Sequence, residues 1–337
     1  VRRQRQMCIR DSADTIHKAL EASVRETGRT YFERNEANPL EEDLIIVDEA
    51  SMLDISLFYH LLCALKDGAR LILVGDIDQL PPVGAGEPLK DLMSWGYVPI
   101  VRLKRIFRQE EGSGIVENAA LIRKGEMCVP DEAGEFRIIY AADDEDAYQI
   151  VMDLCRELNY GNEENKMLLQ VLSPMYRGVC GVDHLNESLQ EMIHGEKVPG
   201  GMKFFPGDKV MQTRNDYEKG IYNGDVGTVW TATPQKVFVR YFDKEVVYEG
   251  EERFDLRLAY AVTVHKSQGS EYETVIFILR PSQHNMLQRN LLYTGVTRAR
   301  KNTILVTAPD ALRRALAIQH TGNRYSLFLP FLNHEAL

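Results

Sequence analysis

The sequence predicts an α/β protein with two parallel-sheet domains, the second interrupted by a small antiparallel β module. Three observations support this class. The chain has 337 residues, more than one hydrophobic core usually fills. Short apolar runs alternate with helical patterns over most of its length. Residues 200–256 instead hold short alternating segments and the dipeptide Asn223-Gly224, a tight hairpin signal typical of antiparallel sheets.

The first predicted domain begins with a helical pattern that becomes loop-like by residue 35. Residues 44–47 (LIIV) form a continuous apolar run, which predicts a buried strand. An amphipathic helix over 54–66 and a strand over 69–75 follow after short connections. This order indicates a right-handed strand-helix-strand unit of a parallel sheet. Residues 98–103 are compatible with another strand.

The second predicted domain has helices over 114–126 and 144–158 and a buried strand over 166–174. After the β module, a strand over 274–279, a helix around 286–300 and a strand over 302–307 resume the α/β pattern. We therefore expect the module to be an insert within this domain.

The composition is that of a globular protein in water, with 44% hydrophobic and 27% charged residues. The formal charge of −10 argues against non-specific coating of nucleic acid but is compatible with a local basic groove. No apolar run approaches the roughly 20 residues of a membrane helix, so we expect no membrane partner. The five cysteines form no C-x-x-C pair, which indicates reduced thiols in a cytoplasmic protein and neither disulfides nor a zinc site.

Two acids, Asp48 and Glu49, end the first predicted strand. Ligands of open parallel sheets bind beyond the carboxyl ends of the strands. An acid pair there suits a hydrated Mg²⁺ held by the first carboxylate and a water activated by the second. Taken alone, the two acids are more simply explained as the point where the strand leaves the core and enters solvent.

The next strand ends in LVGDIDQLPPVGAGEPL, residues 73–89. Gly75 allows close approach of a ligand, Asp76 and Gln79 place polar groups at the sheet edge, and Gln79 can bond a terminal phosphate. An ordinary surface turn rich in Pro and Gly is the alternative.

Three further segments concentrate phosphate-binding side chains. Residues 101–109 (VRLKRIFRQ) are basic, and arginine can bond two phosphate oxygens at once, although such clusters are most often solvated faces. Residues 263–268 (TVHKSQ) hold several hydrogen-bond donors, and His265 alone is best explained as a loop histidine. In TRAR, Arg298 and Arg300 would point roughly 200° apart on a helix, so we expect only one to reach a nucleotide.

The segments IIVDEASM, VGDIDQLPPVGAG, LKRIFRQ, VTVHKSQGSE and YTGVTRAR, in this order, resemble motifs II to VI of superfamily 1 helicases, and most of all the RecD-like branch. DTIHKAL (14–20) resembles the short motif that precedes motif II, and residues 204–229 resemble the SH3-like insert of that branch. The resemblance implies two RecA-like domains with Mg²⁺ and ATP between them. It also implies 5′-to-3′ movement on single-stranded DNA and unwinding at junctions with duplex.

The resemblance also implies domain limits. We expect a non-native or sequence-assembly segment over 1–13 and a partial first RecA-like domain over 14–108. The second RecA-like domain would comprise 109–199 and 257–337, with the SH3-like insert over 200–256.

The residue roles that follow from the motifs are of three kinds. Asp48 is implied to bind Mg²⁺, Glu49 to activate water and Gln79 to sense the γ-phosphate, with Arg108 and Arg298 as arginine fingers. Gly75, Asp76, Gly269 and Glu271 would line the nucleotide, Glu271 at its sugar. The residues implied to face the DNA strand are Thr15, His17, Pro82, Ser173, Thr263, His265, Ser267 and Thr294.

The family's phosphate-binding loop, G-x-x-x-x-G-K-[ST], does not occur in the sequence. We expect it in a part of the protein that precedes residue 14, and we expect the chain without it to bind ATP weakly or not at all and to be inactive alone. Two alternatives stay open: a non-catalytic nucleic-acid-binding remnant whose main contact is the β module, and a motor subunit of a recombination nuclease or a conjugative relaxase.

Overall fold

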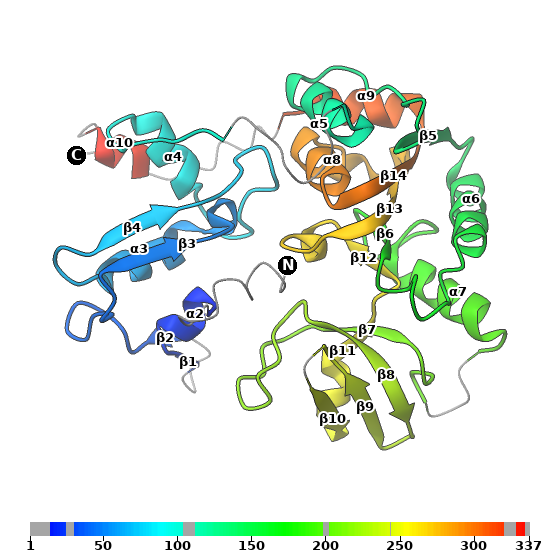
Figure 1. Cartoon of the computed structure of the whole chain (residues 1–337), viewed down its shortest axis with the longest axis horizontal. Coiled ribbons are helices and arrows are strands. Elements are labelled where there is room, and N and C mark those ends of the chain that lie inside the picture. Colours follow the sequence, from blue (N-terminus) through cyan, green and yellow to red (C-terminus); the bar gives the residue numbers. More distant parts are fainter. Residues whose placement is uncertain are drawn as a thin grey trace. The chain divides into compact units, whose positions relative to one another are not determined.

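The structure is a computed structural model, and it describes residues 14–24, 30–103, 112–197, 202–242, 244–319 and 328–333. The chain forms two compact units (Figure 1). Unit 1 comprises Val1–Arg105 and Thr321–Leu337, and unit 2 comprises Ile106–His320. The second predicted domain runs to residue 337, whereas the structure groups the last segment with unit 1.

Unit 1 contains the predicted strand-helix-strand unit. β3 and β4 pair in parallel, from Leu44 opposite Arg70 to Val47 opposite Leu73. The helix between them starts at an Asp54 cap, whose carboxylate accepts from the Leu57 amide at 2.8 Å. The elements are α2 (Ile16–Ala19), β1 (Ala22–Val24), β2 (Thr30–Phe32), β3 (Leu44–Val47), η1 (Ala50–Met52), α3 (Ile55–Cys63), β4 (Arg70–Leu73), α4 (Pro88–Trp95) and α10 (Phe328–Leu332).

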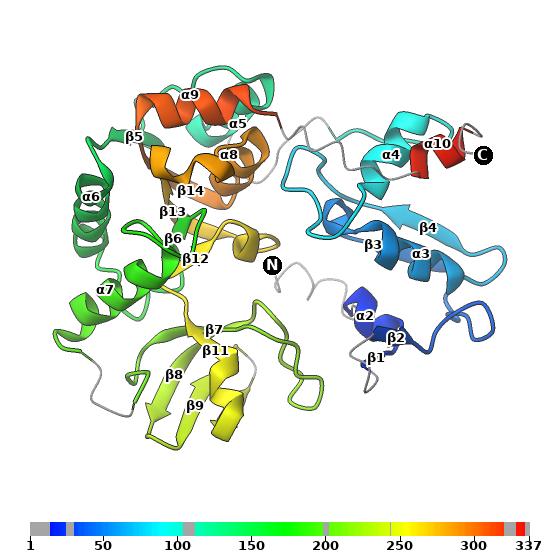
Figure 2. The same ribbon diagram turned by 180° about the vertical axis from the view of Figure 1, so that it is seen from behind.

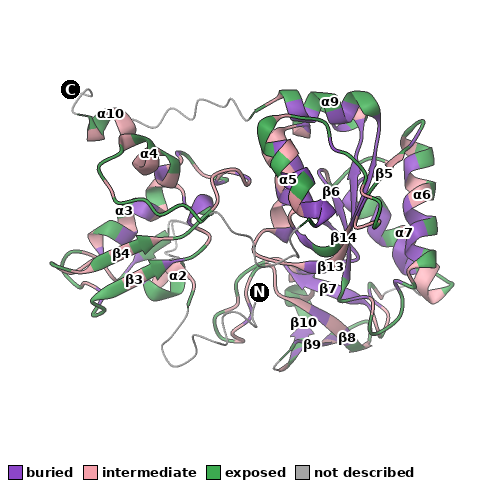
Figure 3. Cartoon of the chain, turned by 45° about the horizontal axis from the view of Figure 1, so that its top comes forward, coloured by how far each residue is buried: buried purple, intermediate pink, exposed green. Residues whose placement is uncertain are grey.

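The prediction that residues 44–47 form a buried strand is right for the strand and wrong for its burial. Leu44 and Ile46 are 47% and 60% exposed, while Val47 is 6% exposed. Figure 3 shows exposed residues along β3. Among the described residues the sheet consists of the two strands β3 and β4, and the buried cluster of unit 1 packs against its other face. An apolar run therefore predicts that a strand forms, but it does not predict how many layers of structure cover that strand.

Two other predictions for unit 1 fail. Residues 98–103 form no strand, and Val101 and Leu103 are 86% and 88% exposed. Part of the segment predicted to be loop-like pairs as the antiparallel strands β1 and β2. At the other end of unit 1, α10 packs on α4, and the Phe328 ring meets the Phe58 ring edge-on at 5.8 Å.

Unit 2 is built on a five-stranded parallel sheet in the order β12-β6-β13-β14-β5. All five residues of β6 are buried, as the sequence predicts for a strand covered on both faces. The strands are β5 (Phe136–Tyr140), β6 (Leu169–Ser173), β12 (Ala261–Thr263), β13 (Tyr272–Leu279) and β14 (Ala299–Thr307).

Helices cover both faces of this sheet (Figures 1 and 2). Ile276 and Ile278 of β13 pack with α6 and α7, whereas Phe277 points to the other face and meets α8. A Cβ on Gly295 of α8 would lie 2.5 Å from the Phe277 ring, so this close approach requires glycine. The helices are α5 (Gly114–Lys124), α6 (Asp144–Glu157), α7 (Val182–His194), α8 (Arg289–Val296) and α9 (Pro309–Ala317).

The predicted antiparallel module is confirmed as a sheet in the order β10-β9-β8-β7-β11, which we call the insert. Asn223-Gly224 forms a tight turn, with Gly224 at φ +94°, but Gly224 bonds back to Gln212. The turn therefore lies at the end of a longer loop between β7 and β8, and these strands are not joined by a two-residue hairpin. The strands are β7 (Lys209–Gln212), β8 (Val226–Ala232), β9 (Lys236–Arg240), β10 (Glu245–Glu249) and β11 (Leu256–Leu258).

Two buried charged residues join the insert to the sheet of unit 2. The Asp208 carboxylate accepts from Tyr260 Oη at 2.9 Å and from the Phe205 amide at 2.7 Å. Lys209 Nζ donates to Leu169 O at 3.1 Å and to Gln170 Oε1 at 2.9 Å. Burial lowers the pKa of Lys209 to about 7 despite these acceptors.

Candidate nucleotide and nucleic-acid sites

The acid pair follows β3 directly, and its backbone is unusual. Glu49 has φ +54° and ψ +37°, a left-handed conformation that is rare for a residue with a side chain. The Asp48 carboxylate accepts from the Glu49 amide at 2.9 Å and thereby supports this bend. Asp48 is exposed and Glu49 half-buried. Strained backbone of this kind is concentrated at functional sites.

The end of β4 packs against the turn that carries the acids. The Ala50 amide donates to Val74 O at 2.8 Å. A Cβ on Gly75 would lie 2.8 Å from both the Ser51 amide nitrogen and Leu89 Cδ2. Only glycine fits there, so the two strand ends predicted to hold a nucleotide do lie together in unit 1. Asp76 turns back on its own loop, accepting from the Asp78 amide at 3.0 Å.

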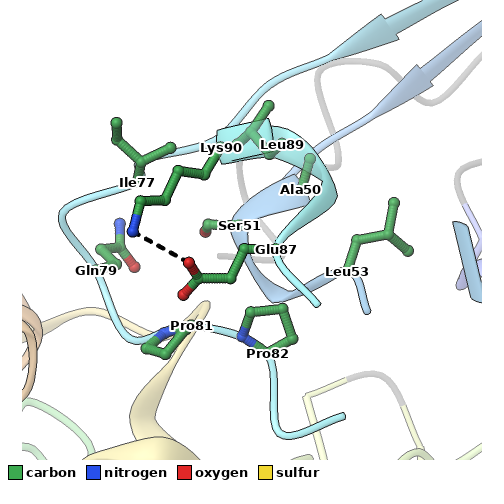
Figure 4. A pocket seen from close by; sticks show the side chains of 10 residues that line it. All are labelled: Ala50, Ser51, Leu53, Ile77, Gln79, Pro81, Pro82, Glu87, Leu89 and Lys90. Atoms are coloured by element: carbon green, nitrogen blue, oxygen red, sulfur yellow. Dashed lines mark hydrogen bonds and ion pairs between the residues drawn. The ribbon is translucent and has the colours of Figure 1, made fainter. Parts of the chain in front are cut away.

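A small pocket lies beside these strand ends (Figure 4). Gln79, predicted to sense phosphate, and Pro82, predicted to face DNA, both line this pocket. Glu87 and Lys90 also line it and form an ion pair of 3.1 Å. Ser51 Oγ is buried there without a hydrogen-bond partner among the described residues. The lining residues are Ala50, Ser51, Leu53, Ile77, Gln79, Pro81, Pro82, Glu87, Leu89 and Lys90.

Sequence reasoning did not single out Ser51, Glu87 or Lys90. The serine follows the acid pair by two positions, and its proximity to the acids is the one signal that could have pointed to it. Glu87 caps α4 and Lys90 lies in its first turn, and Leu89 of the same turn packs closely on Gly75.

A divalent cation would find few protein ligands in unit 1. Within the described parts of the chain, no three His, Cys, Asp or Glu side chains gather into a metal site. Mg²⁺ usually keeps several waters and takes one or two carboxylates plus substrate phosphates. An exposed Asp48 carboxylate fits an ion that keeps its waters and arrives with a nucleotide.

In unit 2, the turn after η3 (His265–Ser267) is tied to the TRAR segment. Gly269 has φ +72°, and Glu271 pairs with Arg300 at 2.6 Å. Arg298 is 2% exposed and donates from Nε to Thr294 O at 3.1 Å and from Nη1 to Ser270 O at 3.3 Å. The predicted helix over 286–300 is too long, because α8 ends at Val296 and Arg300 lies in β14.

Four of the residues predicted to face DNA in unit 2 are buried. Ser173 Oγ donates to Cys180 O at 2.6 Å and Ser267 Oγ to Val264 O at 2.8 Å. Thr263 is 4% exposed and Thr294 fully buried. These side chains shape the strand ends from within, and their contact with DNA stays a prediction.

The remaining predicted residues have varied surroundings. His265 is half-buried, and burial lowers its pKa. Thr15 caps α2 by accepting from the Lys18 amide at 3.2 Å. His17 is exposed, with its ring 5.9 Å from that of Phe32, and Pro82 is buried. Arg108 lies outside the described residues. No described helix is long and apolar enough to cross a bilayer.

Three protein-family models match the chain. An AAA domain matches residues 6–138, the SH3 domain of ATP-dependent RecD-like DNA helicases matches residues 185–241, and a UvrD-like helicase C-terminal domain matches residues 258–306. The first match extends into residues 1–13, whose origin stays a prediction. The second overlaps most of the insert.

Curated relatives point the same way. The chain is 37% identical over 322 residues to the ATP-dependent RecD2 DNA helicase of Deinococcus radiodurans, covering 94% of this chain and 43% of that protein. It is 33% identical to the RecBCD enzyme subunit RecD of Mycolicibacterium smegmatis, covering 94% of this chain and 59% of that subunit. The chain thus spans about half the length of these relatives.

Among solved structures, the Pif1 helicase of Bacteroides in complex with ADP-AlF3 and single-stranded DNA matches with a TM-score of 0.54 and 20% identity. The match covers 95% of this chain and 82% of that one. It supports the fold of two RecA-like domains with an SH3-like insert. Together with the motif order and the geometry of the strand ends, these comparisons show that the chain belongs to the RecD-like branch of the superfamily 1 helicases.

Proposed function

We propose that the complete protein is an ATP-dependent helicase that moves 5′ to 3′ on single-stranded DNA and opens duplex at junctions. The observation that carries the proposal is the left-handed Glu49 beside Asp48, held against the glycine that ends the neighbouring strand. The likeness to the RecD2 DNA helicase supports it. The direction of movement rests on the motif resemblance.

In this proposal Asp48 holds Mg²⁺, which neutralises phosphate charge during hydrolysis. Glu49 accepts a proton from the attacking water or orients it, and the supporting bond from its own amide to Asp48 fixes the backbone that presents it. Gln79 contacts the terminal phosphate and shares its pocket with Pro82, so the phosphate and the DNA strand act on one loop.

Unit 2 contributes the arginine in this proposal. Arg298 now bonds backbone carbonyls of Thr294 and Ser270, so reaching a phosphate requires its guanidinium to exchange those acceptors for phosphate oxygens. In the same proposal, the ion pair between Arg300 and Glu271 holds Glu271 in position while Arg298 changes its partners. The described cysteines, Cys63, Cys128, Cys155 and Cys180, are free thiols, which suits a cytoplasmic setting.

The test uses the product of the complete gene. Glu49→Gln keeps ATP binding but lowers the rate of hydrolysis stimulated by single-stranded DNA by roughly a hundredfold or more, since it removes the group that activates water. Glu42→Gln, at an exposed acid just before β3, is the matched control and leaves the rate unchanged. Normal stimulated hydrolysis by Glu49→Gln would refute the assignment.

Direction is measured with duplexes that carry a single-stranded tail at either the 5′ or the 3′ end. The proposal expects ATP-dependent unwinding of the 5′-tailed substrate alone. A gene product that binds both tails but hydrolyses no ATP, and that lacks a phosphate-binding loop, would instead support the non-catalytic nucleic-acid-binding protein.

A further inference from the structure

Several polar side chains of unit 1 converge in the pocket beside the strand ends. Figure 4 shows four of them with their ends turned toward the same small space: Ser51, Gln79, Glu87 and Lys90. They come from three segments, namely the turn after the acid pair, the loop after β4 and the start of α4. The function proposed above gives a role to Gln79 alone, so the other three side chains need an explanation.

The Ser51 hydroxyl has no structural task in unit 1. Its oxygen is shielded from solvent and has no hydrogen-bond partner among the residues that the structure describes. A buried polar group in this state is unfavourable for the fold, and in a native protein it calls for an explanation. Oε1 of Gln79, in the same pocket, is also shielded from solvent. A hydroxyl can donate to such an amide oxygen.

The chemistry of phosphate sensing dictates how the Gln79 amide must be turned. Phosphate oxygens of a nucleotide accept hydrogen bonds, so the glutamine must present its NH₂ group to them. Its amide oxygen then faces away from the phosphate and needs a donor of its own. The pocket offers two donors, the Ser51 hydroxyl and the Lys90 ammonium. Both are therefore suited to select one of the two orientations of the amide.

Glu87 holds the Lys90 ammonium at this pocket. Nζ of Lys90 lies 3.1 Å from Oε2 of Glu87, and the lysine side chain is 54% exposed, whereas that of the glutamate is 17% exposed. Glu87 stands at the N-cap position of α4, but its side chain makes no capping bond to the helix. A lysine in the first turn of a helix is disfavoured by the helix dipole. The ion pair offsets this effect and directs the lysine to the pocket.

We propose that Ser51 and Lys90 are positioning residues for Gln79. The hydroxyl and the ammonium donate to the amide oxygen of Gln79, either directly or through one water molecule, for which the free volume of about 20 Å³ suffices. The NH₂ group of Gln79 is thereby left available to the terminal phosphate. The inference rests on the proposed function for the identity of the group that Gln79 contacts.

The first experiment is a double-mutant cycle on ATP hydrolysis by the complete gene product, stimulated by single-stranded DNA. Ser51→Ala lowers kcat by about tenfold, the effect of one hydrogen bond, and leaves the KM for ATP within about twofold. Applied to Gln79→Ala, the same change has no further effect on the residual rate, because the group that Ser51 positions is gone. Lys90→Met also lowers kcat, and Lys90→Arg, which keeps the charge and the donors, restores it.

Ser94→Ala is the matched control. Ser94 is exposed on α4, one turn beyond Lys90, and its hydroxyl donates to the backbone oxygen of Lys90 at 2.8 Å. Its loss leaves kcat unchanged. Ser51→Ala keeps the Tm within about 2 °C of the unsubstituted protein, because the hydroxyl that it removes has no partner in the fold.

A second readout needs no hydrolysis. The 337-residue chain labelled with ¹⁵N-glutamine gives a side-chain NH₂ signal for Gln79, which is assigned by its loss in Gln79→Ala. Ser51→Ala and Lys90→Met shift this signal, since each removes a donor to the same amide. Ser94→Ala leaves it in place.

The outcomes separate this inference from the helicase assignment. An active gene product in which Ser51→Ala leaves kcat unchanged, or loses the same factor when Gln79 is already alanine, would overturn the positioning role and leave the helicase standing. A gene product that hydrolyses no ATP would reject the helicase. The Gln79 signal then decides alone: a shift in Ser51→Ala supports the link between the two side chains, and an unmoved signal overturns it.

Discussion

The two units place the same kind of apolar strand in different surroundings. In unit 2, β13 is flanked by β6 and β14 and covered by helices on both faces, and its last five residues are buried. In the described part of unit 1, β3 pairs with β4 alone, and Leu44 and Ile46 are exposed. Sequence pattern selects the strand, whereas the number of neighbouring layers determines how much each side chain stabilises the fold.

The predicted catalytic side chains of the two units also differ in their exposure to solvent. Unit 1 presents an exposed Asp48 and a half-buried Glu49 on a strained turn after β3. In unit 2, Arg298 is buried and donates hydrogen bonds to backbone carbonyl groups. The first arrangement leaves a carboxylate ready for a ligand. If Arg298 binds phosphate as proposed, it must first exchange these carbonyl partners for phosphate oxygens.

The largest effect is expected in the sheet of unit 2. Phe277→Ala removes a fully buried ring that fills the gap beside Gly295, and it should lower the free energy of unfolding by about 3–5 kcal/mol. Urea denaturation followed by circular dichroism measures it. A loss below about 1 kcal/mol would mean that the two faces of this sheet are not packed as described.

A smaller loss is expected at the strand ends of unit 1. Gly75→Ala forces a Cβ to within 2.8 Å of the Ser51 backbone nitrogen, which should cost about 1–3 kcal/mol. Val83→Ala, at a side chain 90% exposed in the same loop, is the control and should be nearly neutral. Unchanged stability of Gly75→Ala would show that the acid-bearing turn is not pressed against β4.

Stability should depend on pH through Lys209. Its pKa is about 7 in the folded chain against 10.5 for the free side chain, so the unfolded state binds more protons between these values. The free energy of unfolding should therefore rise from pH 7 to pH 9, by up to about 1.4 kcal/mol per unit, as the cost of burying the ammonium is relieved. Lys209→Met should flatten this part of the profile in urea titrations. The same slope in both proteins would contradict the assignment to Lys209.

The smallest effect is expected on the open face of unit 1. Ile46→Ala removes a side chain that is 60% exposed and should change the free energy of unfolding by about 0.5 kcal/mol or less. Compared with Phe277→Ala under the same conditions, it measures the contrast between the two sheets directly. A loss as large as that of Phe277→Ala would mean that this face is covered in solution.

Much of the fold could be predicted from local pattern. Apolar periodicity located β3, α3 and β4, the fully buried β6 and the insert, because each signal lies within one segment. The strands β1 and β2 escaped detection because they are only three residues long. The helix predicted up to residue 300 ends at Val296, and β14 begins three residues later. Gly295 lies inside the helix and does not follow its last residue, so it gives no clear stop signal at that position.

The positions of candidate site residues could be predicted where the residues lie in one local motif. They could not be predicted where the surroundings come from segments far apart in the sequence. Gly75 packs against the backbone of Ala50 and Ser51, which follow the acid pair, and Gln79 lines the pocket beside that turn, as the two strand ends suggest. Burial of Ser173 and Thr294 could not be read from the chain, since it depends on the loops and helices packed over the strand ends.

The central claim is that side chains of both units serve one hydrolysis reaction. The most direct measurement compares Arg298→Ala with the unsubstituted complete gene product for ATP turnover and for single-stranded DNA binding, with Arg298→Lys and thermal unfolding as checks on folding. The account predicts that turnover falls about a thousandfold or more, the usual effect of losing an arginine finger, while the Kd for DNA stays within about twofold. Equal losses of turnover and DNA binding, or no loss of either, would contradict it.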